Sequence, residues 1–118
     1  MFDRAEARID LDRIKANIKH LKDVSQTPVM AVVKADAYGH GLISVARAAL
    51  EAGATSLGVA LLEEAITLRQ AGITAPILAW LVPPGSDYTL AVDNEIELAA
   101  SSIKALEEIG AVKSNNRP

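Results

Sequence analysis

The sequence predicts an α/β protein built on a parallel β-sheet. Short runs of Val, Ile and Leu alternate with Ala-rich amphipathic segments, and glycines or prolines separate most of them. Strands that alternate with helices pair in parallel through right-handed crossovers, because each helix returns the chain to the same end of the sheet. Only 3% of the residues are aromatic, so the core must be built from aliphatic side chains and alanine.

Composition limits the class of protein. The 118 residues suffice for one domain, and the balance of 50% hydrophobic to 23% charged residues is typical of a globular chain. A net charge of −3 gives no reason to expect binding to nucleic acid or to an anionic membrane. No apolar stretch reaches the roughly 20 residues that span a bilayer, and the N-terminus lacks the apolar centre of a secretory signal. The absence of cysteine excludes disulfides and thiolate metal sites, so we expect a cytoplasmic protein without a metal.

The first helix is predicted over residues 11–24. Its apolar residues recur at steps of three and four and so form one stripe: Leu11, Ile14, Ile18, Leu21 and Val24. Asp10 is placed to cap the helix at its N-terminus. The preceding residues 6–9 are expected to form a short strand.

The next segments predict four βα units. Residues 29–33 are a continuous apolar run that ends on Lys34, which is typical of a strand buried on both faces of a parallel sheet. A loop over 35–41 and a helix that ends at Gly53 complete this unit. Three further strand and helix pairs follow over 56–60 and 61–71, 76–81 and 86–92, and 96–100 and 103–109, before a polar tail over 113–118.

Two architectures fit four such units: an open doubly wound sheet and a closed (β/α)₈ barrel. No GxGxxG motif follows the first strand, which weakens the dinucleotide-binding version of the open sheet. A barrel needs eight units and about 250 residues. We therefore expect residues 1–118 to be the N-terminal part of a barrel, and this chain to be a fragment.

Lys34 is the first candidate for chemistry. In both architectures the functional groups gather at the carboxyl ends of the strands, where Lys34 stands. An amine that closes an apolar run is partly desolvated, which favours its neutral, nucleophilic form and allows it to form a Schiff base with an aldehyde cofactor. The alternative is a strand-terminal lysine whose charged end reaches solvent.

The residues after Lys34 add to this signal. Tyr38 follows four residues later, and Gly39 and Gly41 flank His40 just before a helix. A phenol at this point could reach a phosphate, the glycines allow positive φ angles, and a helix N-terminus offers free N–H groups to an anion. The alternative is an ordinary glycine-rich turn.

The segment VVKADAYGHG, residues 32–41, resembles the cofactor-lysine signature of alanine racemases. The resemblance extends to EARIDLDRIKANIKHLK and to VARAALEAGATSLGVALLEEAITLRQAGITAPILAWL, and it is weak only after Pro84. These enzymes consist of a pyridoxal-phosphate-binding (β/α)₈ barrel and a C-terminal β domain. The resemblance therefore implies an isomerase that interconverts L- and D-alanine and supplies D-alanine for peptidoglycan, as a homodimer.

The same resemblance assigns roles to single residues. Lys34 would be the Schiff-base lysine and one of two acid/base groups, and Tyr38 would lie beside the cofactor on its phosphate side. His40 would order the loop, and Asp36 would be a turn residue. In the family the second acid/base group is a tyrosine from the partner's C-terminal domain. Because that domain is absent from this chain, we expect the chain alone to be inactive.

The roles of three further residues, and one alternative function, are considered next to this resemblance. Tyr88 is the only other tyrosine and is expected to be a partly exposed helix residue. Trp80 could line a pocket at the end of its strand or fill the core. Leu61 stands where the family often has a serine that caps the next helix. Because leucine cannot cap, we expect the helix to be less stable by about 1 kcal/mol. The alternative function is a non-enzymatic barrel that binds pyridoxal phosphate.

Overall fold

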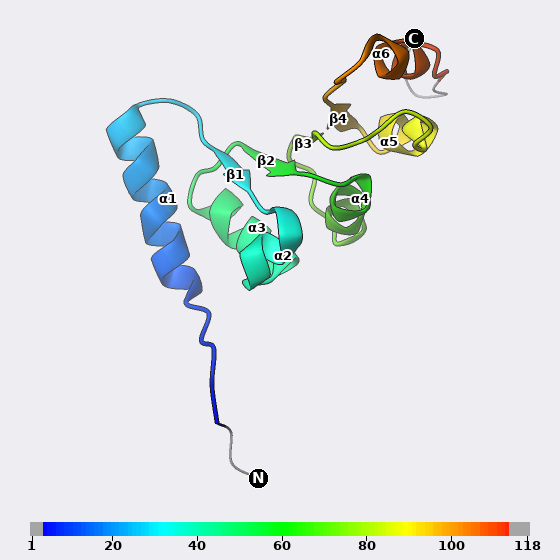
Figure 1. The fold of residues 1–118 in the computed structure, drawn as a ribbon. Coiled ribbons are helices and arrows are strands. Elements are labelled where there is room, and N and C mark those ends of the chain that lie inside the picture. Colours follow the sequence, from blue (N-terminus) through cyan, green and yellow to red (C-terminus); the bar gives the residue numbers. More distant parts are fainter. Residues whose placement is uncertain (1–3, 114–118) are drawn as a thin grey trace.

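The computed structural model describes residues 4–113, so the first three residues and the polar tail over 114–118 lie outside the described part. Two helices follow β1, and from β2 onward strands and helices alternate (Figure 1). In chain order the elements are α1 (Leu11–Ser25), β1 (Met30–Val32), α2 (Lys34–Gly39), α3 (Leu42–Glu51), β2 (Ser56–Val59), α4 (Leu62–Gln70), β3 (Ile77–Ala79), α5 (Tyr88–Asp93), β4 (Ile96–Leu98) and α6 (Ile103–Gly110).

The four strands form one parallel sheet in the order β1-β2-β3-β4. Its register pairs Val32 with Gly58, Gly58 with Leu78, and Leu78 with Glu97. Sequential order without a reversal is the arrangement of barrel strands, whereas a doubly wound sheet reverses its order at a switch point. The predicted α/β class with parallel βα units is therefore confirmed.

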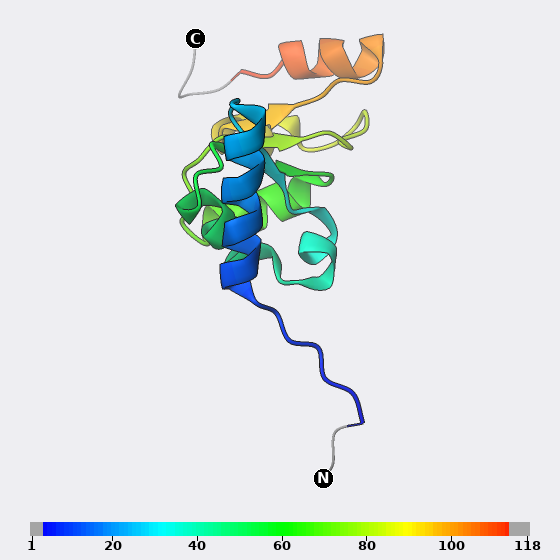
Figure 2. The same ribbon diagram turned by 90° about the vertical axis from the view of Figure 1, so that its left-hand side faces the viewer.

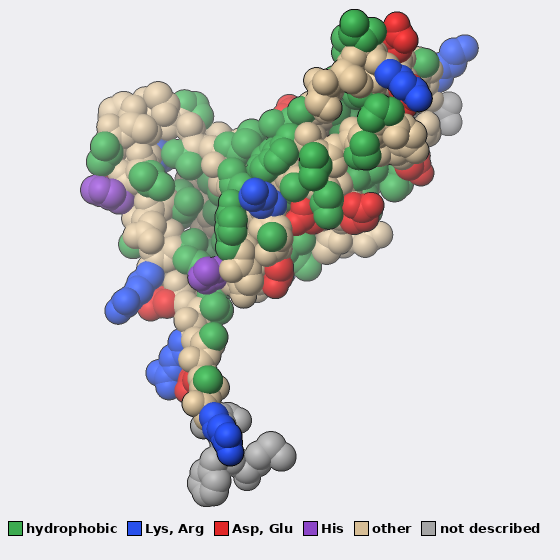
Figure 3. Space-filling model, viewed as in Figure 1, with side chains coloured by type: hydrophobic (Ala, Val, Ile, Leu, Met, Phe, Trp, Pro, Cys, Tyr) green, Lys and Arg blue, Asp and Glu red, His purple; other side chains and the backbone are tan. Residues whose placement is uncertain are grey.

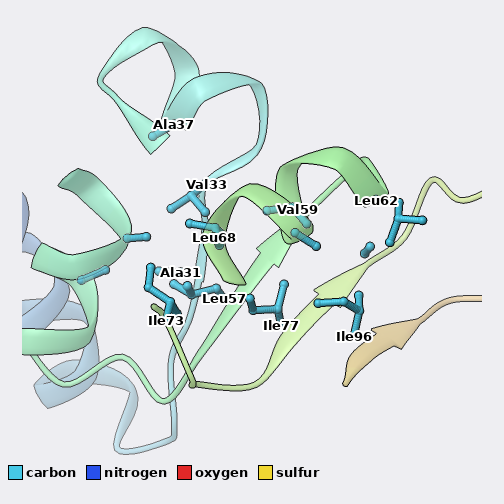
Figure 4. Packing of buried hydrophobic residues seen from close by; sticks show 14 of the residues in the cluster. Ala31, Val33, Ala37, Leu57, Val59, Leu62, Leu68, Ile73, Ile77 and Ile96 are labelled. Carbon is cyan, nitrogen blue, oxygen red and sulfur yellow. The ribbon is translucent and has the colours of Figure 1, made fainter. Parts of the chain in front are cut away.

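The helices pack against one face of this sheet. On β1 and just after it, Ala31 and Val33 are only 6% and 1% exposed, whereas Met30 and Val32 are 39% and 42% exposed. The buried side chains join those of the next strands, Leu57, Val59 and Ile77, and the α4 residue Leu68 in a single core (Figure 4). The prediction that the 29–33 strand is buried on both faces is thus wrong, because no helix covers the second face among residues 4–113.

Helix α1 begins as predicted, since the Asp10 carboxylate accepts the Arg13 backbone N–H at 3.1 Å. It packs along α3 and stands at the side of the sheet (Figure 2). The Lys15 ammonium and the Glu51 carboxylate, 2.6 Å apart, join the two helices. The C-terminal end of the apolar stripe lies outside this contact, since Leu21 and Val24 are exposed.

The strand expected over residues 6–9 does not form. These residues are exposed and run away from the domain without a neighbouring strand in the described part of the chain (Figure 1). Their alternating apolar and charged residues suit a strand, but a strand also needs a partner for its backbone N–H and C=O groups. That prediction is wrong for this chain.

Arg69 at the end of α4 fixes the amino-terminal side of the sheet. Its guanidinium donates to four backbone carbonyls, those of Ile73 and Ala75 before β3 and those of Asn94 and Glu95 before β4, at 2.8–3.0 Å. A planar guanidinium with five donors suits such convergent carbonyls. One side chain therefore ties the starts of two strands to one helix.

No helix within residues 4–113 is both long enough and apolar enough to cross a membrane.

Candidate functional site

Lys34 lies directly after β1, at the carboxyl edge of the sheet, and is half-buried. Its two chain neighbours are both held by groups of the following βα unit. The Val33 N–H donates to the Gly58 carbonyl at 2.9 Å, and the Ala35 N–H donates to the Glu64 carboxylate at 2.6 Å. The Lys34 backbone is thereby fixed on both sides, at the edge where parallel α/β folds place their chemistry.

The turn after Lys34 is a left-handed helix of four consecutive residues. Ala35, Asp36, Ala37 and Tyr38 have φ angles between 52° and 56° and ψ angles between 37° and 50°. The sequence predicted a loop here, and that prediction is wrong. The left-handed helix was not predicted because none of its four residues is glycine, the residue that this region of φ and ψ favours. A left-handed helix costs roughly 1–2 kcal/mol per non-glycine residue. Backbone strain of this kind is concentrated at functional sites.

Hydrogen bonds within the segment stabilise the left-handed turn. Ala37 N–H donates to the Val33 carbonyl at 2.9 Å, and Gly41 N–H donates to the Asp36 carbonyl at 2.9 Å. The Asp36 carboxylate accepts the Leu42 N–H, the first of helix α3, at 2.8 Å. The His40 Nδ1 lies 2.9 Å from the Ala37 carbonyl. These contacts agree with the turn role predicted for Asp36 and the loop-ordering role predicted for His40.

The turn brings Lys34 and Tyr38 together. The Lys34 Nζ lies 5.7 Å from the centre of the Tyr38 ring, within the range of a cation–π contact. Tyr38 is 62% exposed, so its phenol is available to a ligand. An apolar groove lined by α1, β1 and the turn runs beside it and includes Ile18, Val32 and His40. The structure therefore places the two predicted site residues side by side, with the amine and the phenol on one side of the turn.

The start of α3 is a poorer anion site than the sequence predicted. The Leu42 N–H, which the sequence left free for a phosphate, is already bonded to the Asp36 carboxylate. A carboxylate at a helix N-terminus also cancels the positive end of the helix dipole. The first N–H of α3 is therefore not free to bind an anion.

Glu64 is the site residue that the sequence did not reveal. Its Oε2 accepts the Ala35 N–H at 2.6 Å, and its Oε1 accepts the N–H groups of Leu61 at 2.8 Å and Ala60 at 3.2 Å. The Leu61 side chain has no acceptor, so the third residue of α4 supplies the cap instead. The spacing Leu61 to Glu64 is half of a capping box, a signal that could have pointed to Glu64.

Trp80 and Tyr88 differ in their burial. Trp80 is half-buried, and a Cβ built on Gly58 would be 2.7 Å from its ring, so the ring covers Gly58 on the helix-free face of the sheet. Hydrophobic side chains gather over the strands on the surface seen in Figure 3.

The predicted partial exposure of Tyr88 is wrong: this residue is 5% exposed, and its hydroxyl donates to the Pro83 carbonyl at 2.7 Å. Burial raises the pKa of the Tyr88 phenol above 10.0, and the Glu108 carboxylate adds to the effect.

Residues 4–113 contain no group of three or more His, Asp or Glu side chains placed to hold a metal ion.

Comparison with known proteins identifies relatives of the chain. Residues 9–118 match the family model described as the alanine racemase N-terminal domain. An alanine racemase of Thermobifida fusca is 56% identical over 110 residues, which are 92% of this chain and 29% of the relative. The chain spans less than a third of the length of the curated relatives that it matches.

Solved structures agree with the sequence match. The crystal structure of alanine racemase from Corynebacterium glutamicum aligns with a TM-score of 0.87 and 39% identity, over 91% of this chain and 32% of that one. The histidine racemase of Leuconostoc mesenteroides aligns with a TM-score of 0.78 and 34% identity, over 84% of this chain and 27% of that one. The same scaffold thus serves racemases named for two different amino acids.

Proposed function

The chain belongs to the alanine racemase family, whose N-terminal domain it matches, and from this membership we propose that it forms part of a pyridoxal-phosphate-dependent racemase of alanine. The observation that carries the proposal is the position of Lys34. It follows a parallel strand, its backbone is held on both sides, and its amine lies beside an exposed phenol. In this proposal residues 1–118 are the N-terminal part of a (β/α)₈ barrel.

The residues present fit the cofactor. A half-buried amine at the strand end suits covalent attachment of an aldehyde, and the exposed phenol four residues later suits a contact with a phosphate. Lys34 would hold the cofactor through Nζ, and Tyr38 would lie beside it on the phosphate side. When bound, pyridoxal phosphate withdraws electrons from the substrate Cα, so that the α-proton becomes acidic.

Lys34 has a second task in the proposal. With pyridoxal phosphate bound, the Lys34 amine would remove or return the substrate α-proton on one face. Racemisation requires another acid/base group on the opposite face. Tyr88 does not serve, because its hydroxyl is buried and donates to the Pro83 carbonyl. We assign that role to a tyrosine from the C-terminal domain of a partner subunit, so that the active enzyme is a homodimer.

Alanine is proposed as the substrate because curated relatives that are 53% and 56% identical to the chain are named alanine racemases. The histidine racemase aligns at lower identity, so the choice of substrate depends on residues beyond the shared scaffold. A cytoplasmic enzyme that supplies D-alanine for peptidoglycan is the corresponding cellular role. The alternative, a non-enzymatic cofactor-binding barrel, has none of the reported relatives in its favour.

Reductive trapping tests the cofactor site. The purified chain is incubated with pyridoxal phosphate, reduced with borohydride, digested and mapped by mass spectrometry. We expect a pyridoxyl group on Lys34 that forms at lower cofactor concentration than adducts on exposed lysines such as Lys104. In Lys34→Ala only the slower adducts should remain. Labelling of other lysines with Lys34 unmodified would contradict the proposal.

A chimeric enzyme tests the reaction. This chain replaces the matching segment of the Thermobifida fusca enzyme, to which it is 56% identical over 110 residues. We expect the chimera to racemise alanine, and Lys34→Ala in the chimera to abolish the activity. A folded chimera that binds the cofactor and leaves alanine unchanged would show that this segment does not support the reaction.

A further inference from the structure

We propose that Glu64 is a positioning residue for Lys34, an inference that rests on the proposed cofactor site. Its carboxylate is the one side chain that bridges the left-handed turn after β1 and the loop after β2 among the described hydrogen bonds. Three backbone N–H groups converge on it. A carboxylate with its two oxygens suits such a bridge, since each oxygen can accept from a different loop.

The first step concerns the backbone beside Lys34. A helical turn of either hand leaves its first N–H groups without partners inside the turn. The Ala35 N–H is such a group, and Glu64 Oε2 accepts it at 2.6 Å. Charge-assisted bonds of this kind are about twice as strong as neutral ones. Glu64 therefore caps the left-handed turn at the residue that follows Lys34.

The second step concerns where Glu64 itself is held. It is the third residue of α4, and its Oε1 accepts the Leu61 N–H at 2.8 Å. One carboxylate thus caps a right-handed helix and a left-handed turn together. Because Leu68 and Ala65 of α4 are fully buried in the core, the position of the carboxylate is fixed by packing. The core thereby determines the direction in which the backbone leaves β1.

The third step connects this bridge to the amine. Val33 is bonded to Gly58 of β2, and Ala35 is bonded to Glu64 of α4, so Lys34 is suspended between two contacts to the same βα unit. Loss of the second contact leaves the turn with its internal bonds alone. A strained left-handed backbone then has fewer constraints, and the Lys34 amine samples more orientations relative to Tyr38.

Two substitutions remove the bridge by different routes. Glu64→Gln keeps one acceptor oxygen, which can serve Leu61 or Ala35 but not both, while its NH₂ group meets an N–H donor. Glu64→Asp keeps the charge but is one methylene shorter, so it can cap α4 without reaching Ala35. The matched control is Glu63→Gln, which removes the same charge from the adjacent, exposed residue.

The test measures cofactor binding by the full chain. Absorbance gives the dissociation constant for pyridoxal phosphate, induced circular dichroism at saturation reports the orientation of bound cofactor, and urea unfolding reports stability. For Glu64→Gln and Glu64→Asp we expect binding to weaken about tenfold, and the dichroism per bound cofactor to change. Glu63→Gln should match the unmodified chain in all three measurements.

The outcomes separate this inference from the proposed function. If the unmodified chain forms no adduct at Lys34, the cofactor site itself is wrong. If the unmodified chain forms the adduct and both Glu64 variants retain its affinity and dichroism, Glu64 does not position Lys34. A fall in the urea midpoint without a change in dichroism at saturation also contradicts the inference, since a purely structural role predicts that result.

Discussion

The indole ring of Trp80 lies over the backbone of Gly58 on the face of the sheet that the helices leave uncovered. A Cβ at position 58 would be 2.7 Å from the Trp80 ring and 3.0 Å from the Met30 sulfur. Gly58 is also the central residue of the register, paired with Val32 on one side and with Leu78 on the other. Glycine at this position leaves the space that the Trp80 ring occupies next to the sheet.

We therefore expect Gly58→Ala to destabilise the protein by about 1 kcal/mol, the lower end of the cost of overpacking, because the ring can swing outward on an uncovered face. Urea unfolding measures the loss, and a red shift of the tryptophan fluorescence reports the displaced ring. Gly110→Ala is the control, since a Cβ there meets nothing within 4 Å. In a Trp80→Leu background the cost should largely disappear, and an undiminished cost would contradict the contact.

The left-handed turn reverses the usual effect of glycine. Ala35 is exposed and has φ 52°, so Ala35→Gly relieves a left-handed conformation and should stabilise the protein by about 0.5 to 1 kcal/mol. Ala16 is exposed in the right-handed helix α1, where the identical change should cost about 1 kcal/mol. Equilibrium unfolding in urea compares the two variants. Equal signs would show that the turn is not left-handed.

The buried phenol of Tyr88 predicts a loss of stability at alkaline pH. Its pKa is raised in the folded protein by burial and by Glu108, so its contribution is present below 10.0, the ordinary value, and is lost as pH rises through the folded value. Tyr88→Phe should cost about 1 to 2 kcal/mol at neutral pH, because the Pro83 carbonyl loses its donor.

Unfolding free energies measured on both sides of pH 10 check this prediction. The difference between Tyr88→Phe and the unmodified chain should shrink as the pH rises. Tyr38→Phe is the control, because the exposed Tyr38 hydroxyl should contribute little to stability. A difference that stays constant with pH would contradict the raised pKa.

The ion pair between Lys15 and Glu51 predicts a second pH effect, at the junction of α1 and α3. The hydrogen bond and the charge of Lys15 lower the pKa of Glu51 below 4.5, and Glu51 raises the pKa of Lys15 above 10.5 in the same two ways. The lowered pKa of Glu51 means that its contribution is present above 4.5 and is lost as pH falls through the folded value.

Glu51→Gln should therefore lower the urea midpoint at pH 7 and leave it nearly unchanged well below pH 4. High salt should reduce the effect at pH 7, since Glu51 is exposed and Lys15 is only half-buried, so that ions in solution screen the pair. Glu107→Gln, an exposed carboxylate of α6, is the control. A midpoint that falls equally at both pH values would exclude the ion pair as the cause.

The sequence predicted the four strands of the sheet, the major helices and the position of Lys34, because hydrophobic period and helix caps are local properties. It could not predict the left-handed turn. Residues 35–38 contain no glycine, and among them only Asp36 has any preference for positive φ. The bond from the Ala35 N–H to Glu64 joins residues 29 positions apart. The burial of Tyr88 was missed for a similar reason, since its partners are backbone carbonyls that no side-chain pattern reveals.

The one-sided burial of the first strand shows a further limit. An unbroken apolar run from Val29 to Val33 is consistent with cover on either face or on both. The structure decides this question, since the helices lie on one face only and Met30 and Val32 remain partly exposed. An apolar strand can be buried on either face or on both, and the neighbouring elements determine which of its side chains are buried.

The four-carbonyl clamp of Arg69 lies at the opposite end of the sheet from Lys34. Substitutions at the Arg69 end and at the Lys34 end of the sheet should therefore have different consequences in a cell. Damage at the arginine end would reduce the amount of folded protein, which chaperones and proteases control. Damage at the lysine end would leave abundance intact and remove only the chemistry. Under the proposed racemase function, a saturation-mutagenesis library sorted once for abundance and once for growth without external D-alanine should resolve these two ends as separate groups of intolerant positions.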